Sequence, residues 1–205
     1  MPYVEASARS RQVVAAARRV LARDGVARTS LRAVAAEANV PLGTLQHVFP
    51  SKEKLLRAVI EDVVGEIAEV LKSSAELERG LEHAIRQGLT NFWSQLVVGD
   101  RNLQIMQYEL STHALRTPGL ESLARWQYER YSRIVAAWCQ EAAGNAGETC
   151  AVPFGRLARV LLASVDGLII QYVCNPDATR SAEDLEDVIT MLVALADVRP
   201  AGHGQ

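Results

Sequence analysis

The sequence predicts an all-α protein of about nine helices. Apolar residues recur every three or four positions along most of the 205 residues, which is the period of an amphipathic helix. No segment of convincing length alternates apolar and polar residues as a half-buried β-strand would. The chain is long enough to bury a sizeable core, and its composition is typical of a soluble globular protein. We therefore expect helices packed on helices throughout.

The first helix is expected over residues 9–23. Its apolar stripe repeats at helical spacing and comprises Val13, Val14, Ala17, Val20 and Leu21. Asp24 and Gly25 follow this stripe, and Gly25 can adopt the positive φ that closes a helix. The arginines off the apolar face indicate either a solvated surface or contact with phosphate groups; they are Arg11, Arg18, Arg19 and Arg23.

Residues 29–52, TSLRAVAAEANVPLGTLQHVFPSK, predict two short helices, a tight turn between them and the start of a longer helix. Thr29 or Ser30 can cap the first short helix, and Asn39 tolerates the positive φ at its end. Pro41 can begin the second, because its missing N–H needs no partner there. The second helix is too short to be stable alone, so the first must support it. This is the helix-turn-helix arrangement that enters the major groove of DNA.

The same stretch resembles the DNA-binding segment of TetR-family repressors, and the similarity extends from about Arg11 to Leu56. The matching positions are Thr29-Ser30, Val34-Ala35, Ala38-Asn39-Val40-Pro41, Gly43-Thr44-Leu45, Phe49 and Ser51-Lys52-Glu53. Asn39, Pro41 and Gln46 stand where the family has glycine, serine and tyrosine. The resemblance implies a sequence-specific transcriptional regulator, a homodimeric repressor that leaves a palindromic operator when a small ligand binds.

The residues expected to contact DNA lie just before the first short helix, in both short helices and at the start of the next one. They are Arg28, Thr29, Ser30, Arg32, Leu42, Gly43, Thr44, Gln46, His47 and Lys52. Thr44 can bond a base or a phosphate, and Gln46 can pair with adenine. His47 is assigned to phosphate, and the resemblance implies the same for Lys52. Leu45 is expected in the core instead.

Charge is distributed unevenly along the chain. Residues 1–54 hold nine Lys or Arg and four Asp or Glu, whereas the remainder holds 13 basic and 20 acidic residues. A basic head on an acidic body is typical of a protein that touches nucleic acid at one end only. We expect double-stranded DNA to be the partner of this head.

Six further helices are expected beyond residue 51. Their ranges are 52–72, 81–98, 102–115, 119–143, 156–174 and 181–198. Thr117-Pro118-Gly119 and Asn175-Pro176-Asp177 mark two of the turns between them. The sequence therefore predicts a DNA-binding domain of residues 1–51, a ligand-binding and dimerisation domain of residues 52–198, and a disordered tail of residues 199–205.

The helix expected over residues 156–174 is apolar nearly all round and carries Ala163, Ser164 and Gly167, whose small side chains permit close packing. It is either a core helix of a monomer or part of a two-fold four-helix interface. The Asp166-Gly167-Leu168 run resembles one common in TetR-family dimerisation helices, and it favours the interface. The expected interface residues are Leu161, Ser164, Leu168, Tyr172, Val188 and Leu192.

Most of the large aromatic side chains lie beyond residue 90, where they are either ordinary core or the lining of an apolar ligand pocket. The resemblance implies a pocket between the helices of this region, for a small apolar or aromatic ligand. Candidate lining residues are Trp93, Met106, Leu110, Trp126 and Asp166. Asp166 could instead belong to a structural hydrogen-bond network.

No catalytic or metal site is predicted, and we expect neither an enzyme nor a cofactor. The histidines are scattered, and no nucleophile–base pair, glycine-rich phosphate loop or metal motif stands out. We expect a cytoplasmic protein without a membrane segment, because there is no signal sequence, the most apolar run (residues 160–174) is short for a bilayer, and the three cysteines form no framework. The alternative function is a ligand-independent, nucleoid-associated DNA-binding protein of the same fold.

Overall fold

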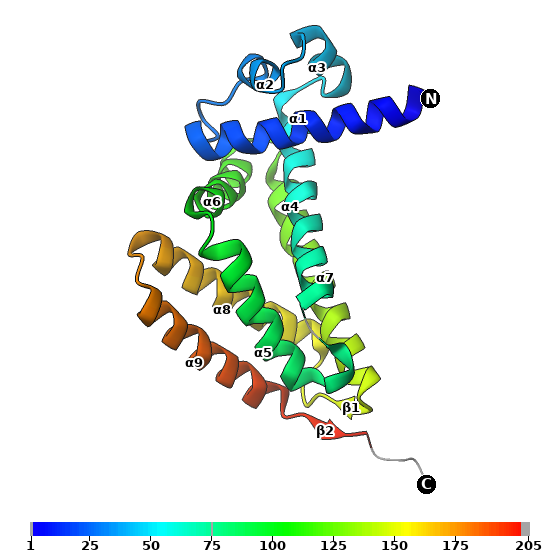
Figure 1. Cartoon of the computed structure of the whole chain (residues 1–205), viewed down its shortest axis with the longest axis vertical. Coiled ribbons are helices and arrows are strands. Elements are labelled where there is room, and N and C mark those ends of the chain that lie inside the picture. The colour runs from blue at the N-terminus through cyan, green and yellow to red at the C-terminus, as the bar shows by residue number, and fades with distance from the viewer. Residues whose placement is uncertain (1, 75, 202–205) are drawn as a thin grey trace. The chain divides into compact units, whose positions relative to one another are not determined.

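The computed structural model describes residues 2–74 and 76–201, and it confirms the all-α prediction (Figure 1). The described residues form nine α-helices: α1 (Pro2–Asp24), α2 (Leu31–Glu37), α3 (Leu42–Val48), α4 (Lys52–Ser74), α5 (Leu81–Phe92), α6 (Arg101–Arg116), α7 (Glu121–Asn145), α8 (Phe154–Cys174) and α9 (Ala178–Ala196). A 3₁₀ turn, η1 (Leu77–Arg79), precedes α5, and a π-helical segment, η2 (Trp93–Val97), follows it. The expected helices are thus all present.

The segment after α9 forms a short strand rather than a disordered tail. Strand β2 (Arg199–Pro200) pairs antiparallel with β1 (Glu148–Thr149) in the loop before α8. The register places Glu148 opposite Pro200 and Thr149 opposite Arg199. Asp197, with a φ of +37°, closes α9 in the left-handed region and redirects the chain. The tail prediction is therefore wrong for residues 199–200, and residues 202–205 lie outside the described part of the chain.

The chain packs as two compact units. The head unit comprises Met1–Gly65 and Arg101–Gln127, and the body unit comprises Glu66–Asp100 and Tyr128–Gln205. The borders fall within α4 and α7, so α6 and the beginning of α7 belong with the amino-terminal helices. The division into domains at residue 51 stays a prediction, because this packing does not test which segment folds alone.

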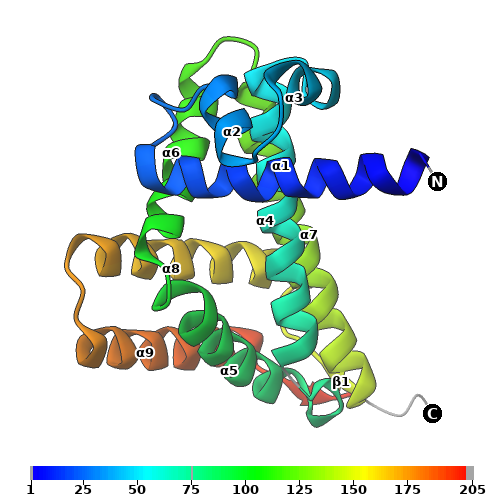
Figure 2. The ribbon, with the colours of Figure 1, turned by 45° about the horizontal axis from the view of Figure 1, so that its top comes forward.

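In the head unit, α1 packs against both α2 and α6, and α2 packs against α3 (Figure 2). Large side chains from these helices and α4 are fully buried; they are Leu21, Leu45, Leu55, Leu56, Ile60 and Met106. Each helix carries one apolar face, so the core forms where those faces meet. The short helices α2 and α3 are thereby held by α1 and need little stability of their own.

In the body unit, α8 packs on α9, and α5 packs on α9. The buried side chains that join them include Leu81, Ile85, Leu157, Ile189 and Leu192. By length and composition, α8, with 21 residues, is long and apolar enough to cross a membrane, which the shorter run seen in the sequence did not indicate. A core helix has the same character, but only 33% of the apolar stretch of α8 is buried, so α8 packs on α9 through one face and leaves other apolar side chains exposed.

Gly88 of α5 provides the close approach on which the body core depends. A Cβ at this position would lie 2.6 Å from both Cη2 and Cζ2 of Trp138, whose side chain is buried in the body core. We expect Gly88→Ala to lower the free energy of unfolding by about 1–2 kcal/mol, because the clash outweighs the better helix propensity of alanine. A Cβ at Gly65 in α4 would meet no atom within 4 Å. Gly65→Ala is therefore expected to raise the free energy of unfolding by about 0.5–1 kcal/mol. Urea denaturation measures both, and shifts of the same sign would contradict the packing argument.

Candidate nucleic-acid interface

Helices α2 and α3 form the helix-turn-helix that the sequence predicts. Ser30 caps α2, and its Oγ accepts the N–H of Ala33 at 3.2 Å. Asn39 closes the turn with a φ of +52°, the conformation expected of it. The side-chain amide of Gln12 on α1 donates to the carbonyl of Ala38 at 2.9 Å. This bond satisfies the end of α2 and holds the turn against α1.

Helix α3 has one buried and one exposed face. Leu45 is 0 % exposed and points into the core, as predicted. The opposite face is solvent-accessible and carries Leu42, Gly43, Thr44, Gln46 and His47, of which Gly43, Gln46 and His47 are the most exposed. This face offers an amide, a hydroxyl and an imidazole and has no carboxylate. Such groups can donate to and accept from base edges without repelling the phosphate backbone.

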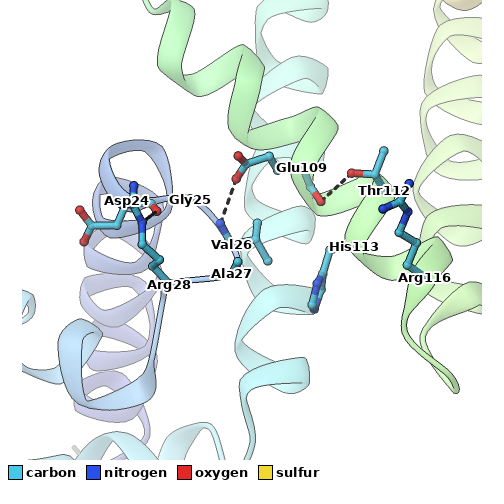
Figure 3. A pocket seen from close by; sticks show the side chains of 9 residues that line it. All are labelled: Asp24, Gly25, Val26, Ala27, Arg28, Glu109, Thr112, His113 and Arg116. Carbon is cyan, nitrogen blue, oxygen red and sulfur yellow. Dashed lines mark hydrogen bonds between the residues drawn. The ribbon is translucent and has the colours of Figure 1, made fainter.

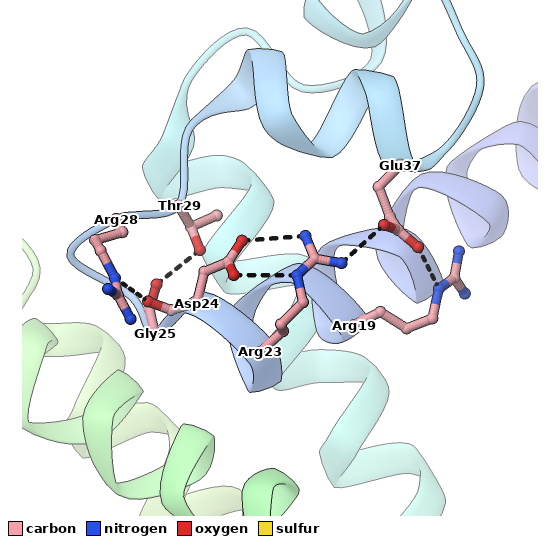
Figure 4. Close-up of polar contacts among 7 residues, drawn as sticks. All are labelled: Arg19, Arg23, Asp24, Gly25, Arg28, Thr29 and Glu37. Atoms are coloured by element: carbon pink, nitrogen blue, oxygen red, sulfur yellow. Dashed lines mark hydrogen bonds and ion pairs between the residues drawn. The ribbon is translucent and has the colours of Figure 1, made fainter.

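The arginines of α1 are largely committed to ion pairs within the head unit (Figure 4). Glu37 of α2 accepts Arg19 Nε at 2.8 Å and Arg23 Nη1 at 3.1 Å, and Arg23 also pairs with Asp24. Hydrogen bonds from Arg19 and then Arg23 hold the pKa of Glu37 below its usual value. The pairs with Glu37 join α1 to α2 and use the Nε of Arg19 and one terminal nitrogen of Arg23.

The other arginines of this region differ in whether they bond to groups within the protein. Arg28 is exposed, and its Nε donates to the carbonyl of Asp24 at 2.8 Å. Arg18 pairs with Asp62 of α4 at 2.8 Å. Arg11 and Arg32 are exposed and form no ion pair with any acid among the described residues. Of the two arginines among the expected DNA contacts, Arg28 and Arg32, the second is therefore the better placed to bind phosphate.

Thr29 does not have the position expected of a DNA contact. Its side chain is only 4 % exposed, and its hydroxyl donates to the carbonyl of Gly25 at 2.8 Å. The prediction for Thr29 is therefore wrong, because Ser30 caps the helix and Thr29 turns inward to hold the preceding loop. The sequence alone could not show which of Thr29 and Ser30 caps α2, since both residue types can serve as a cap.

Lys52 is also engaged inside the protein. Its Nζ donates to the carbonyl of Val26 at 2.7 Å, and burial lowers the pKa of its ammonium group. The N–H of Val26, which is 3 % exposed, donates to Glu109 of α6 at 2.9 Å. The peptide groups on both sides of Val26 are thus held by α4 and by α6, an arrangement that we call the Val26 clamp. A phosphate contact by Lys52 stays a prediction.

The protein families that the chain matches agree with the helix-turn-helix geometry of α2 and α3. The family model "Bacterial regulatory proteins, tetR family" matches residues 13–59, and the model "Tetracyclin repressor-like, C-terminal domain" matches residues 61–195. The chain belongs to the TetR family. It is therefore a DNA-binding transcriptional regulator with an amino-terminal helix-turn-helix, as the sequence predicts. Members of this family are regulators rather than enzymes, and they bind DNA as dimers.

Several TetR-family relatives are similar over nearly their whole length. The nicotine-responsive transcriptional repressor HdnoR of Paenarthrobacter nicotinovorans is 29% identical over 185 residues, covering 88% of this chain and 92% of the relative. The probable regulator ArpR of Pseudomonas putida is 27% identical, covering 96% and 95%. Among solved structures, the multidrug binding protein EbrR complexed with ethidium is 29% identical with a TM-score of 0.68, covering 90% and 98%.

The five residues expected to line a ligand pocket fall into different units. Met106 and Leu110 of α6 are 1 % and 2 % exposed in the core of the head unit. Trp126, in the same unit, lies under the guanidinium of Arg57, with the Cζ 5.4 Å from the ring centroid. Trp93 and Asp166 belong to the body unit. The five therefore do not form one site within a compact unit.

In the body unit, the partly buried carboxylate of Asp166 on α8 contacts Tyr128 on α7. The Tyr128 hydroxyl hydrogen-bonds to its carboxylate, and burial raises the pKa of Asp166. Trp93 packs edge-on against Tyr172 of α8, with ring centroids 5.8 Å apart. Sequence reasoning did not assign Tyr128 to Asp166, because the two residues lie on different helices whose relative rotation no local pattern encodes.

Half of the predicted dimer-interface residues are buried inside the chain. Leu161, Val188 and Leu192 are at most 9 % exposed, because they form the contact between α8 and α9. The prediction is therefore wrong for these three. The large apolar residues that α8 and α9 expose are Val160, Ile170 and Met191. Because α8 is apolar on more than one face, its sequence could not show which face meets α9.

Proposed function

We propose that this TetR-family regulator is a homodimeric, cytoplasmic repressor that binds a palindromic operator and is released by a small organic cation. The observation that carries the ligand class is Asp166, a partly buried carboxylate hydrogen-bonded to Tyr128 in a unit that also holds the Trp93–Tyr172 pair. A carboxylate among aromatic rings attracts a delocalised cation, because burial strengthens the charge interaction and the ring faces add to it.

The names of the relatives support the same class of ligand. HdnoR is described as nicotine-responsive, and solved structures of EbrR contain ethidium, malachite green and proflavin. All these molecules combine an aromatic ring system with a cationic nitrogen. Release would follow if the cation prefers a state whose two reading heads no longer match the operator half-sites.

Dimerisation supports the palindromic operator in this proposal. Two copies related by a two-fold axis present two α3 helices, and each reads the same half-site in opposite orientation. We place the interface on the outer faces of α8 and α9, where Val160, Ile170 and Met191 are 36 %, 43 % and 57 % exposed. Small neighbours on α8, among them Ala163, Ser164 and Gly167, would allow a partner helix to approach closely.

The ligand proposal is tested by titrating ethidium into the protein without DNA, because ethidium also binds DNA. We expect Asp166→Asn to weaken ethidium binding by at least about tenfold, since the amide keeps a partner for Tyr128 but removes the charge. Glu183→Gln, an exposed acid on α9, is the matched control and should leave binding unchanged. Ethidium keeps its charge at all pH values, so wild-type affinity should fall as acid protonates Asp166. Equal weakening in both variants would exclude Asp166 as the counter-ion.

A further inference from the structure

A cavity of about 540 Å³ opens beside the Val26 clamp, within the head unit (Figure 3). One wall is the turn Asp24–Arg28 between α1 and α2. The other wall is the carboxyl-terminal half of α6, which contributes Glu109, Thr112, His113 and Arg116. Its volume lies in the range that small-molecule sites occupy. The α6 wall has no part in the functions proposed above, apart from the bond between Glu109 and Val26.

Both carboxylates of this cavity already have partners in the protein. Glu109 accepts the N–H of Val26 at 2.9 Å. Asp24 accepts Arg23 at 3.0 and 3.1 Å, and the hydrogen bond from Arg23 lowers the pKa of Asp24. Asp24 is thus neutralised by a guanidinium, whereas Glu109 keeps its charge and lies about two helical turns from Arg116 along α6.

The basic side chains of the cavity keep unused donors. The Nε of Arg28 donates to the carbonyl of Asp24, so the two terminal nitrogens of its guanidinium are still available as donors. Arg116 is exposed and forms no ion pair with the described acids. His113 is half-buried, its Nε2 lies 3.5 Å from the hydroxyl oxygen of Thr117, and its ring lies between the turn and Arg116 in Figure 3. Donors from two walls thus border one space, and Val26 and Ala27 add apolar surface.

We propose that this cavity binds a small organic carboxylate. The carboxylate would accept from Arg116 and His113, which lie three residues apart on α6, and the apolar body of the ligand would lie against Val26 and Ala27. Such a ligand joins α6 to the turn that the Val26 clamp holds. It is a different chemical class from the cation proposed for the body unit, and it occupies a different unit.

Calorimetric titration of the full-length protein with benzoate tests this site. Benzoate should bind with one-to-one stoichiometry, and benzamide, which has the same ring without the charge, should bind about tenfold more weakly. Arg116→Gln should weaken benzoate binding by about tenfold as well, because a charge-assisted hydrogen bond is lost. Arg125→Gln on α7 is the matched control, since Arg125 is exposed and lies outside the cavity.

Several results would overturn the proposal. Benzamide or inorganic phosphate binding as tightly as benzoate would show that the site does not select an organic carboxylate. Equal effects of Arg116→Gln and Arg125→Gln would reveal only general attraction of an anion to a basic surface. Circular dichroism of both variants confirms folding. The titration contains neither DNA nor a cationic ligand, so its failure leaves the proposed repressor function untouched.

Discussion

Leu45→Ala is expected to abolish specific DNA binding, whereas Gln46→Ala, at the adjacent position, should weaken it at one base pair. Leu45 is 0 % exposed and fixes α3, a helix of seven residues, to the head unit. Its truncation should lower the free energy of unfolding by about 2–5 kcal/mol, because it leaves a cavity in place of the one buried side chain of this short helix. Gln46 is exposed on the opposite face, so its truncation should leave that free energy almost unchanged.

The two variants are separated by measuring unfolding and DNA binding together. For Gln46→Ala we expect a loss of about 1–3 kcal/mol in binding free energy that disappears when the contacted base pair is changed. Fluorescence anisotropy on a set of operators mutated one base pair at a time shows this, starting from an inverted repeat upstream of the protein's own gene. A uniform loss across all operators would exclude Gln46 as a reader of a base. Unaltered unfolding of Leu45→Ala would contradict its structural role.

The helix-turn-helix was predictable because its determinants are local. A cap at Thr29 or Ser30, the positive φ of Asn39 and the inward position of Leu45 each follow from a residue and its near neighbours in sequence. Most helix boundaries were predictable for the same reason, since glycine and proline mark them, but α1 begins at Pro2 and not at residue 9 as expected. The exposed face of α3 then followed from helical spacing alone, once Leu45 was assigned to the core.

What the sequence could not show depends on contacts between distant residues. Lys52 lies 26 positions from Val26, and Glu109 lies 83 positions from it, so no window of sequence contains the Val26 clamp. The same limit explains the error at the dimer interface. Val188 and Leu192 repeat at helical spacing whether their face meets α8 or a second copy, and only packing decides.

Breaking the Val26 clamp should weaken DNA binding to all sequences equally. Glu109→Ala leaves the buried N–H of Val26 without an acceptor, which should cost about 1–3 kcal/mol of stability in the head unit. Glu109→Gln is the matched control, because its amide oxygen can still accept that N–H. Lys52→Met removes the other half of the clamp, and Lys54→Met, an exposed lysine two positions further along α4, controls for the change in charge. Thermal unfolding and DNA anisotropy measure the two effects.

The salt dependence of binding distinguishes the clamp from a phosphate contact. A lysine that neutralises a phosphate releases a counterion, so its loss reduces the slope of log affinity against log salt by about 1. If Lys52 acts only through Val26, Lys52→Met should lower affinity at every salt concentration and leave this slope unchanged. Glu109→Ala should behave in the same way, although it removes an acid instead of a base. A reduced slope for Lys52→Met with a normal slope for Glu109→Ala would assign Lys52 to the phosphate backbone, which the family resemblance implies. If both variants lose the same affinity and keep the normal salt slope, α4 and α6 position the helix-turn-helix through the two peptide groups that flank Val26.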